Sequence, residues 1–418
     1  MSPTVPRPMH IGCDPETKHH MKQNLTLRYC LHQCAYWAAA AGILTFATTF
    51  LLAKGFPASQ VGVLMACGSI LSCITQPLLA ERADRSETCI LVPLIVGLTA
   101  ISTLCFALLL LPTLPSRLFG LLYLMGVWSF DAMIPLLNSV SVYYNEHNRP
   151  INYGLGRGVG SFAYSLAALG LGYLIEGLGP NWMIYSVLVL LPACILITLG
   201  YPRLLEASAE HRSTQSVTQK PCSVGVFFLR YRWYCASLVG VLLLAMFHAM
   251  TENYLIAIFG RLGGDSRHVG ISLFIATVAE APVLFFFSQI RTKISDHWLL
   301  RYAAFSFLLK SVCFYFASSI THIYLIQLLQ ITSYAFLSPV QVYYANEKVS
   351  QADMVKGQAF ITASYTLGCA MGNFTGGQLL EYFGVSAIIL AGILIAAMGT
   401  LVILLTVERR DTYLTDNP

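Results

Sequence analysis

Charged side chains are scarce in this chain of 418 residues. Asp, Glu, Lys and Arg make up 11% of the sequence, whereas hydrophobic residues make up 56%. Soluble domains carry about 25% charged residues, so the composition excludes an ordinary soluble globular protein. The mean hydropathy of +0.64 over the whole length also argues against a soluble domain with a single anchor. The sequence therefore indicates a protein with many membrane-spanning segments.

Sequence patterns of enzymes and metal sites are missing too. None of the 12 cysteines stands in a CxxC pair, which argues against a zinc site or a disulfide framework. Paired carboxylates, nucleophile motifs and glycine-rich phosphate loops are also absent, so we predict neither an enzyme nor a cofactor. The first 20 residues are polar and contain proline, unlike a cleavable signal peptide. We interpret residues 1–26 as a cytoplasmic tail, in which Met21 is an alternative start of translation.

Twelve apolar segments follow, each long enough for the roughly 20 residues that a crossing helix needs. The predicted helices lie at 27–53, 59–79, 88–112, 116–144, 153–177, 181–200, 233–259, 268–289, 298–318, 321–345, 357–382 and 385–407. The polar stretch 201–232 is a predicted cytoplasmic linker, and 408–418 is a predicted second tail. The predicted fold is an all-α membrane protein in which 27–200 and 233–407 form two bundles of six helices.

The basic residues favour one orientation in the membrane. If both termini are cytoplasmic, the cytoplasmic side holds 19 Lys and Arg residues and the outer loops hold 4, with Arg157 and Lys310 inside the membrane. Cytoplasmic loops are generally enriched in Lys and Arg, so we predict that both termini are cytoplasmic. The formal net charge of +5 then reflects topology, and no nucleic-acid partner is expected.

An internal repeat relates the two predicted bundles. The segment from Gly55 to Gly62 recurs in spacing 208 residues later, from Gly263 to Gly270. The pattern G-x-L-x-E-x-x-G occurs around Glu176 and again around Glu381, and V-Y-Y ends both the fourth and the tenth predicted helix. Three matches in the same order indicate a duplicated six-helix unit, an arrangement that places a binding site between the halves near the middle of the membrane.

Six ionisable residues fall inside the predicted helices, where a charge costs about 2.5–3.5 kcal/mol. Counting from the connecting loops at about 1.5 Å per residue places Asn138 at the depth of Arg157. The same counting places Lys310 and His248 at the depth of Glu280. We therefore predict one polar cluster in each half. The first holds Asp131, Asn138 and Arg157; the second holds His248, Glu280 and Lys310, with Glu252 one helical turn from His248.

These residues have two interpretations. One is structural: pairs such as Glu280 and Lys310 brace neighbouring helices, because pairing lowers the cost of burial. The other is a transport site, in which Arg157 hydrogen-bonds a solute and Glu280 carries a proton. In that case the substrate-binding residues are Arg157, Asn138, Asp131, His248, Glu280 and Tyr164, and the proton-coupling residues are Glu280, Glu252, Lys310 and Asp131. Further candidates in the membrane are His32, Trp128, Phe162 and Tyr254.

The loop between the second and third predicted helices carries a familiar motif. Its sequence Glu81-Arg82-Ala83-Asp84-Arg85 resembles the loop signature G-x-x-x-D-R-x-G-R-R/K of the major facilitator superfamily. Asp84 and Arg85 are retained, which implies a gating role, whereas Ala80 replaces the leading glycine and the trailing basic pair is absent.

Within that superfamily the chain resembles proton-coupled permeases of the phenylpropionate-permease and lactose-permease kind over nearly its whole length. The segments Phe130–Asn138 and Tyr153–Ser161 are similar to the motifs of the fourth and fifth helices of those permeases. The resemblance implies that Arg157 and Glu280 contact the substrate. Gln330 and Ser333 replace the His and Glu of the tenth helix of the lactose permease, and Gln327 replaces its Lys. This departure argues against a lactose-type proton relay.

The sequence thus predicts a monomeric secondary transporter of a bacterial inner membrane. Its expected partners are a small organic solute, such as a sugar, glycoside, nucleoside or aromatic acid, together with protons and the lipid bilayer. Proton-driven export of drugs or metabolites on the same fold is the first alternative. A receptor or scaffold that does not transport is the second.

Overall fold

In the computed structural model, residues 15–85, 90–202 and 222–407 are described, and they form helices joined by short connections, without a strand. The first half begins with α1 (Pro15–Ala40), the π-helical turn η1 (Ala41–Thr45) and α2 (Ala47–Ala53). We call one helix, or such a run of consecutive helical pieces, a rod; this first rod is broken and bends by 47°. It continues through α3 (Ala58–Arg85), α4 (Leu91–Leu108), α5 (Ser116–Ala132), α6 (Ile134–Glu146), α7 (Tyr153–Leu178) and α8 (Trp182–Leu199).

The second half repeats this order. The short helix α9 (Val224–Arg230) precedes α10 (Arg232–Glu252) and α11 (Leu255–Gly260), which form a second broken rod. The remaining elements are α12 (Ser266–Arg291), α13 (Asp296–Phe316), α14 (Ile320–Gln327), the 3-10 turn η2 (Leu328–Ile331), α15 (Tyr334–Lys348), the 3-10 turn η3 (Gln351–Asp353), α16 (Met354–Phe383) and α17 (Val385–Thr406).

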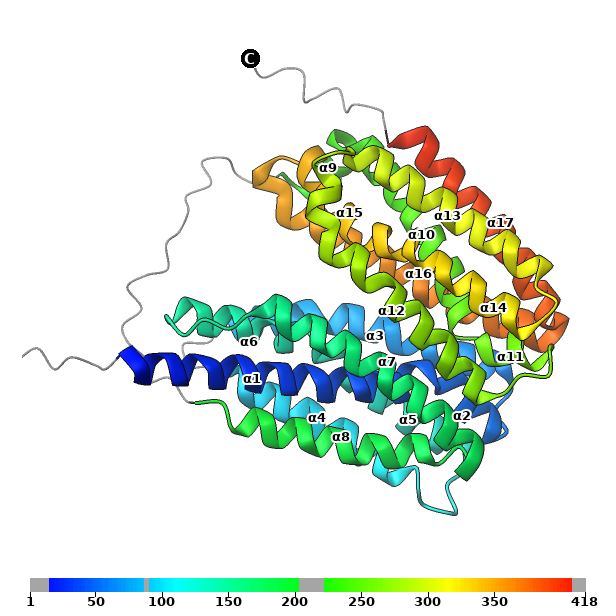
Figure 1. Ribbon diagram of the computed structural model, residues 1–418, viewed down its shortest axis with the longest axis horizontal. Helices are drawn as coiled ribbons and strands as arrows, with labels where there is room; N and C mark the ends of the chain where they lie inside the picture. The colour runs from blue at the N-terminus through cyan, green and yellow to red at the C-terminus, as the bar shows by residue number, and fades with distance from the viewer. Residues whose placement is uncertain (1–14, 86–89, 203–221, 408–418) are drawn as a thin grey trace, which may run out of the picture.

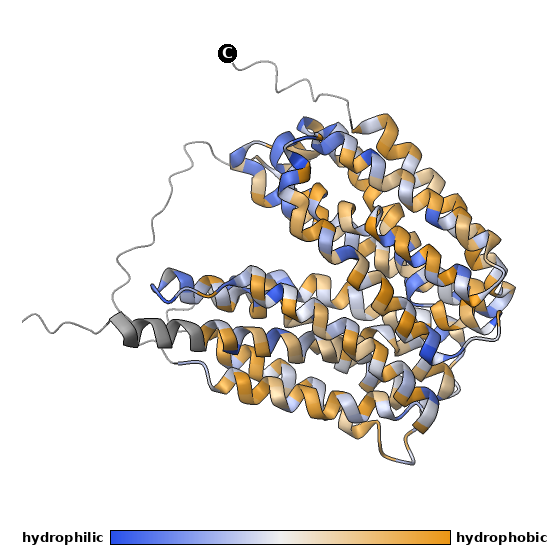
Figure 2. Cartoon of the chain, in the orientation of Figure 1, coloured by the Kyte–Doolittle hydropathy of each residue, from blue (hydrophilic) through white to orange (hydrophobic). Residues whose placement is uncertain are grey.

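Each of the twelve predicted segments coincides with one helical rod. Ten of the described rods are long and apolar enough to cross a membrane, and the bent α1–α2 rod is the eleventh. The twelfth, α16, is less apolar because it packs between α10 and α3 and meets them with small and polar residues such as Gly368, Gly372 and Asn373. Hydrophilic residues gather toward the ends of the rods (Figure 2). The predicted all-α membrane fold is confirmed.

The two bundles, α1–α8 and α9–α17, diverge toward the end that carries both termini and meet at the opposite end (Figure 1). We call these the terminal end and the distal end. The bundles meet where α3 packs on α16 and where α7 packs on α12, and we call this contact the distal seam. Glycines bring the backbones together: a Cβ atom on Gly62 would lie 2.5 Å from the Asn373 carbonyl oxygen, and one on Gly270 would lie 2.5 Å from that of Ala168.

Among the described residues, three hydrogen bonds join the bundles at the distal seam. Glu381 accepts one from the backbone N–H of Ala58 (2.7 Å), and Glu176 accepts one from that of Ser266 (3.2 Å). The third runs from the Gln378 amide to the Ser59 carbonyl. The structure is therefore the conformer that is closed at its distal end.

Candidate functional site

A cavity of about 420 Å³ lies between the two bundles. One wall comes from α1, η1, α2, α3, α5 and α7, and the other comes from α10, α12, η2, α15 and α16. Most of the residues predicted for a transport site line it: Asp131, Arg157, Tyr164, His248, Glu252 and Glu280. Asn138 and Lys310 are not among the lining residues and lie behind the wall.

Arg157 is the cation of the first bundle's wall. Its guanidinium carbon lies 4.0 Å from the centre of the Trp37 ring, and its Nη1 donates a hydrogen bond to Ser161 Oγ at 2.6 Å. No carboxylate of the described residues lies within ion-pair distance of it. Because stacking and one hydrogen bond leave other N–H groups free, Arg157 can donate to a bound solute.

A chain of hydrogen bonds behind the wall fixes the Trp37 ring on which Arg157 stacks. Trp37 Nε1 donates to Gln33 Oε1 (2.9 Å), and Gln33 Nε2 donates to the Tyr29 hydroxyl (2.7 Å) and to Asn138 Oδ1 (3.4 Å). Asn138 therefore supports Gln33, one layer away from the cavity. The sequence places Asn138 at the depth of Arg157, and the structure places its side chain behind the cavity wall. The two agree, because depth in the membrane does not specify which way a side chain faces.

Asp131 lies at a break in the fourth rod. Pro135 has no backbone N–H and cannot bond the carbonyl four residues earlier, which is the carbonyl of Asp131. The Gln76 amide donates to this freed oxygen at 3.0 Å, and the rod divides between α5 and α6. The side chain of Asp131 lines the cavity without an ion-pair partner in the described part of the chain.

The second bundle holds a buried ion pair. Lys310, on α13, is fully buried and donates to Glu252 Oε1 at 2.8 Å and to Gln330 Oε1 at 2.6 Å. Gln327 donates to the other oxygen of Glu252 at 3.1 Å. Counting along the sequence pairs Lys310 with Glu280, whereas the structure pairs it with Glu252. Glu280 lines the cavity, as Gln330 does, and has no salt bridge to any described cation.

Aromatic rings cover much of the remaining wall. His248 stacks on Tyr334 with ring centres 4.9 Å apart, and the Tyr164 hydroxyl lies 2.7 Å from Thr45 Oγ1. Together with Trp37 and Tyr365 these rings give the cavity flat apolar surfaces beside its charges. Sequence reasoning missed Trp37, Tyr334 and Tyr365, and no motif distinguishes them among the 22 tyrosines and 5 tryptophans.

Other predicted residues lie elsewhere. Trp128 donates to Thr75 (3.0 Å), and His32 lies in the first bundle's core beside Thr198 (3.1 Å). Phe162 is 56% exposed on the outer face of α7. Tyr254 packs at the distal seam, where its hydroxyl donates to the Asn373 carbonyl at 2.8 Å. The side chains of Asp84 and Arg85 fall outside the described residues.

Comparisons with known proteins agree with this architecture. The family described as MFS_1 like family matches residues 27–398. The maltose permease of Geobacillus stearothermophilus is 25% identical over 358 residues, which are 85% of this chain and 87% of that protein.

Two similar solved structures are those of the nucleoside transporter NupG and a D-xylose-proton symporter. NupG is 16% identical and superposes with a TM-score of 0.74, covering 92% of this chain and 98% of its own. The symporter is 15% identical, with a TM-score of 0.67 and coverage of 93% and 98%. At these identities the likeness concerns the fold.

Proposed function

Because this chain belongs to the MFS_1 like family and is a multi-pass membrane transporter, we propose that it imports a small polyhydroxylated solute together with protons. A sugar, glycoside or nucleoside fits the proposal best. The protein would reside in the inner membrane of a bacterium as a monomer, with both termini in the cytoplasm, so that the terminal end faces inward.

The observation that carries the proposal is the arrangement of charges across the cavity. Arg157 and Asp131 belong to the wall of one bundle and Glu280 to the wall of the other, and none of the three has an ion-pair partner in the described part of the chain. Hydroxyl groups of a solute can accept from the guanidinium and donate to the carboxylates. A cavity of about 420 Å³ lies in the size range of small-molecule sites, about 300–1,000 Å³.

The relatives support the class of solute. One is named a maltose permease, and the similar folds are named a nucleoside transporter and a D-xylose-proton symporter. Their named solutes all carry hydroxyl groups on rings. The Trp37, Tyr164 and Tyr334 rings on the cavity wall would pack against the apolar faces of such a ring, while Arg157 selects its hydroxyls.

Glu280 is the proposed proton carrier. Glu252 is held by Lys310 and Gln327, so its charge is already balanced, whereas Glu280 lines the cavity without a salt bridge to a described cation. Protonation of Glu280 would remove an unbalanced charge from the bilayer's interior and allow the loaded carrier to reorient. Asp131 is the second candidate for this role, on the opposite wall.

Transport would occur by rocking of residues 27–200 against residues 233–407 around the cavity. With the distal seam closed and the termini inside, the structure would be the inward-facing state. Opening of the cavity to the distal side would then require the α3–α16 and α7–α12 contacts to separate.

The test is uptake by proteoliposomes with an imposed pH gradient. Maltose, xylose, uridine and phenylpropionate are supplied in turn, and we expect one of the hydroxylated solutes to accumulate only when the outside is acidic. The variant Glu280→Gln should lose accumulation but retain exchange of labelled for unlabelled solute. Accumulation by this variant equal to that of the wild type would refute the role of Glu280. Accumulation only under the reversed gradient would indicate an exporter instead.

A further inference from the structure

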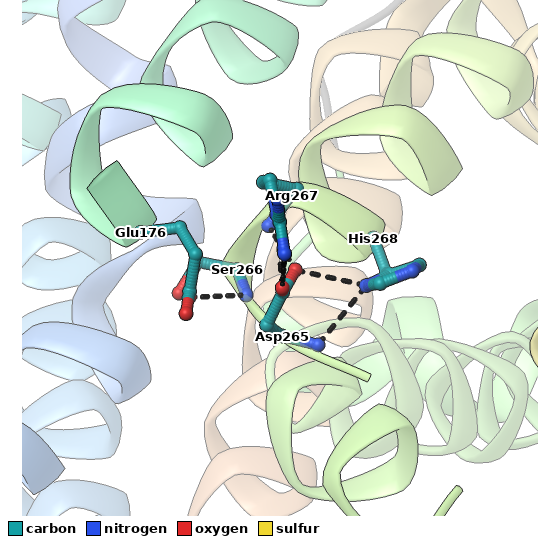
Figure 3. Close-up of polar contacts among 5 residues, drawn as sticks. All are labelled: Glu176, Asp265, Ser266, Arg267 and His268. Carbon is teal, nitrogen blue, oxygen red and sulfur yellow. Dashed lines mark hydrogen bonds and ion pairs between the residues drawn. The ribbon is translucent and has the colours of Figure 1, made fainter. Parts of the chain in front are cut away.

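Two carboxylates at the distal seam each reach from one bundle to the start of a helix in the other. Glu176, near the end of α7, accepts from the first N–H of α12 at Ser266, at 3.2 Å (Figure 3). Glu381, near the end of α16, accepts from the first N–H of α3 at Ala58, at 2.7 Å. Both glutamate side chains are exposed to solvent.

The internal repeat makes the two contacts equivalent. Glu176 and Glu381 hold the same position in the two copies of G-x-L-x-E-x-x-G, and Ala58 and Ser266 hold the same position in the repeat that runs from Gly55 and Gly263. Each half therefore gives one carboxylate and receives one. We call these two contacts the paired latches.

Each latch has a clear physical basis. The first N–H groups of a helix lack partners within the helix and carry partial positive charge, so a carboxylate there is stabilised. The close approach of the glycines on α3, α7, α12 and α16 brings the carboxylates within reach. The latches can form only while the seam is closed, because their two partners belong to different bundles.

We infer that Glu176 and Glu381 are positioning residues of the transport cycle, which bias the carrier toward the state closed at its distal end. This inference rests on the proposed alternating access. Both latches have to break before the cavity can open distally, so their effects on that equilibrium multiply. Neither residue touches the cavity, and their removal leaves the solute contacts intact.

The chain offers a matched control on the same helix. Asp265 caps α12 from within its own bundle: its Oδ1 accepts from Arg267 N at 2.9 Å and its side chain contacts Arg267 and His268 (Figure 3). Asp265→Asn reduces the negative charge at the start of α12 without crossing the seam. A merely structural capping role predicts equal effects for Asp265→Asn and Glu176→Gln, whereas a latch predicts an effect only for the latter.

The test uses Cys369, which lines the cavity, as a reporter of distal opening. A membrane-impermeant maleimide is added to the distal side of sealed vesicles, and labelling of the Cys369 peptide is followed by mass spectrometry. We expect Glu176→Gln and Glu381→Gln each to speed labelling about two- to five-fold, the double variant to show the product of the two factors, and Asp265→Asn to label like the wild type.

Salt gives a second readout on the same reporter. Exposed charges are screened at high ionic strength, so added salt should speed labelling in the wild type more than in the double variant. Wild-type labelling rates in both single variants, or equal acceleration by Asp265→Asn, would overturn the inference. The assay needs no solute, so the latches can fail while proton-coupled uptake stands, and uptake can fail while the latches stand.

Discussion

The buried pair of Lys310 and Glu252 gives the most quantitative prediction. The Lys310 side chain is 1% exposed and that of Glu252 is 11% exposed, with a separation of 2.8 Å. Removing one partner of such a pair costs about 3–5 kcal/mol, because a buried charge is left unbalanced. We therefore expect Lys310→Met and Glu252→Gln each to lower the free energy of unfolding by that amount.

The double variant distinguishes this pair from two independent contacts. With both charges gone there is no unbalanced ion. The double variant should therefore lose only about 1–3 kcal/mol, the cost of leaving Gln330 Oε1 without its Lys310 donor, which is less than the loss in either single variant. The hydrogen bond from Gln327 to position 252 is retained by glutamine, which limits the loss. Chemical unfolding in detergent micelles of the four proteins gives the coupling energy directly.

An exposed ion pair serves as the control cycle. Arg267 and Asp265 lie 2.5 Å apart, but the Arg267 side chain is 49% exposed, and such pairs contribute about 0.2–1 kcal/mol. The variants Arg267→Met and Asp265→Asn should therefore show little coupling. If the Lys310 and Glu252 single costs add up in the double variant to within about 0.5 kcal/mol, the claim that these charges balance each other is wrong.

Three further predictions follow from other contacts. Arg157→Lys keeps the charge but loses the planar fork and its stacking on Trp37, so the apparent affinity in uptake assays should weaken about tenfold; an unchanged KM would remove Arg157 from the site. Asp353→Ala should lower the free energy of unfolding by about 1–3 kcal/mol, since its buried carboxylate accepts from the Cys222 N–H and the Tyr231 hydroxyl, and an unchanged unfolding midpoint would contradict this. The Arg267 guanidinium lowers the pKa of Asp265 to about 2, so its stabilising charge is complete above the ordinary pKa of about 3.9 and is lost as the pH falls toward 2. The protection of the amides in the first turn of α12 against hydrogen exchange, corrected for the intrinsic chemical rate, should thus be constant between pH 5 and 8. Loss of this protection near pH 6 would show that another group controls the start of the helix.

Much of the fold could be read from the sequence because the bilayer imposes it. A crossing helix must be long and apolar, so the twelve segments stand out, and the duplicated motifs at Glu176 and Glu381 reveal two halves. Even α16 (Met354–Phe383), with its small and polar residues, contains a predicted segment, 357–382. The depth of a charged residue also follows, since the rise along a helix is constant.

The direction in which each side chain points could not be predicted from the sequence. Depth places Lys310 near both Glu280 and Glu252, and only the rotation and packing of α10, α12 and α13 select Glu252. Asn138, which follows the interruption at Pro135, accepts from Gln33 and does not line the cavity. The rings of Trp37 and Tyr334 carry no sequence signal that separates a cavity wall from ordinary packing.

The two broken rods have a consequence for how the protein can vary over evolution. The breaks at Thr45–Phe46 and Asn253–Tyr254 occupy equivalent positions in the repeat, 208 residues apart. Beyond them, α2 and α11 are pieces of only 7 and 6 residues, about 10 Å long. Helices this short can tilt at the distal end while α1 and α10 keep their side chains in place around the cavity. Under the proposed function, exchange of cavity residues could therefore change which solute fits while the helices that close the distal end stay the same.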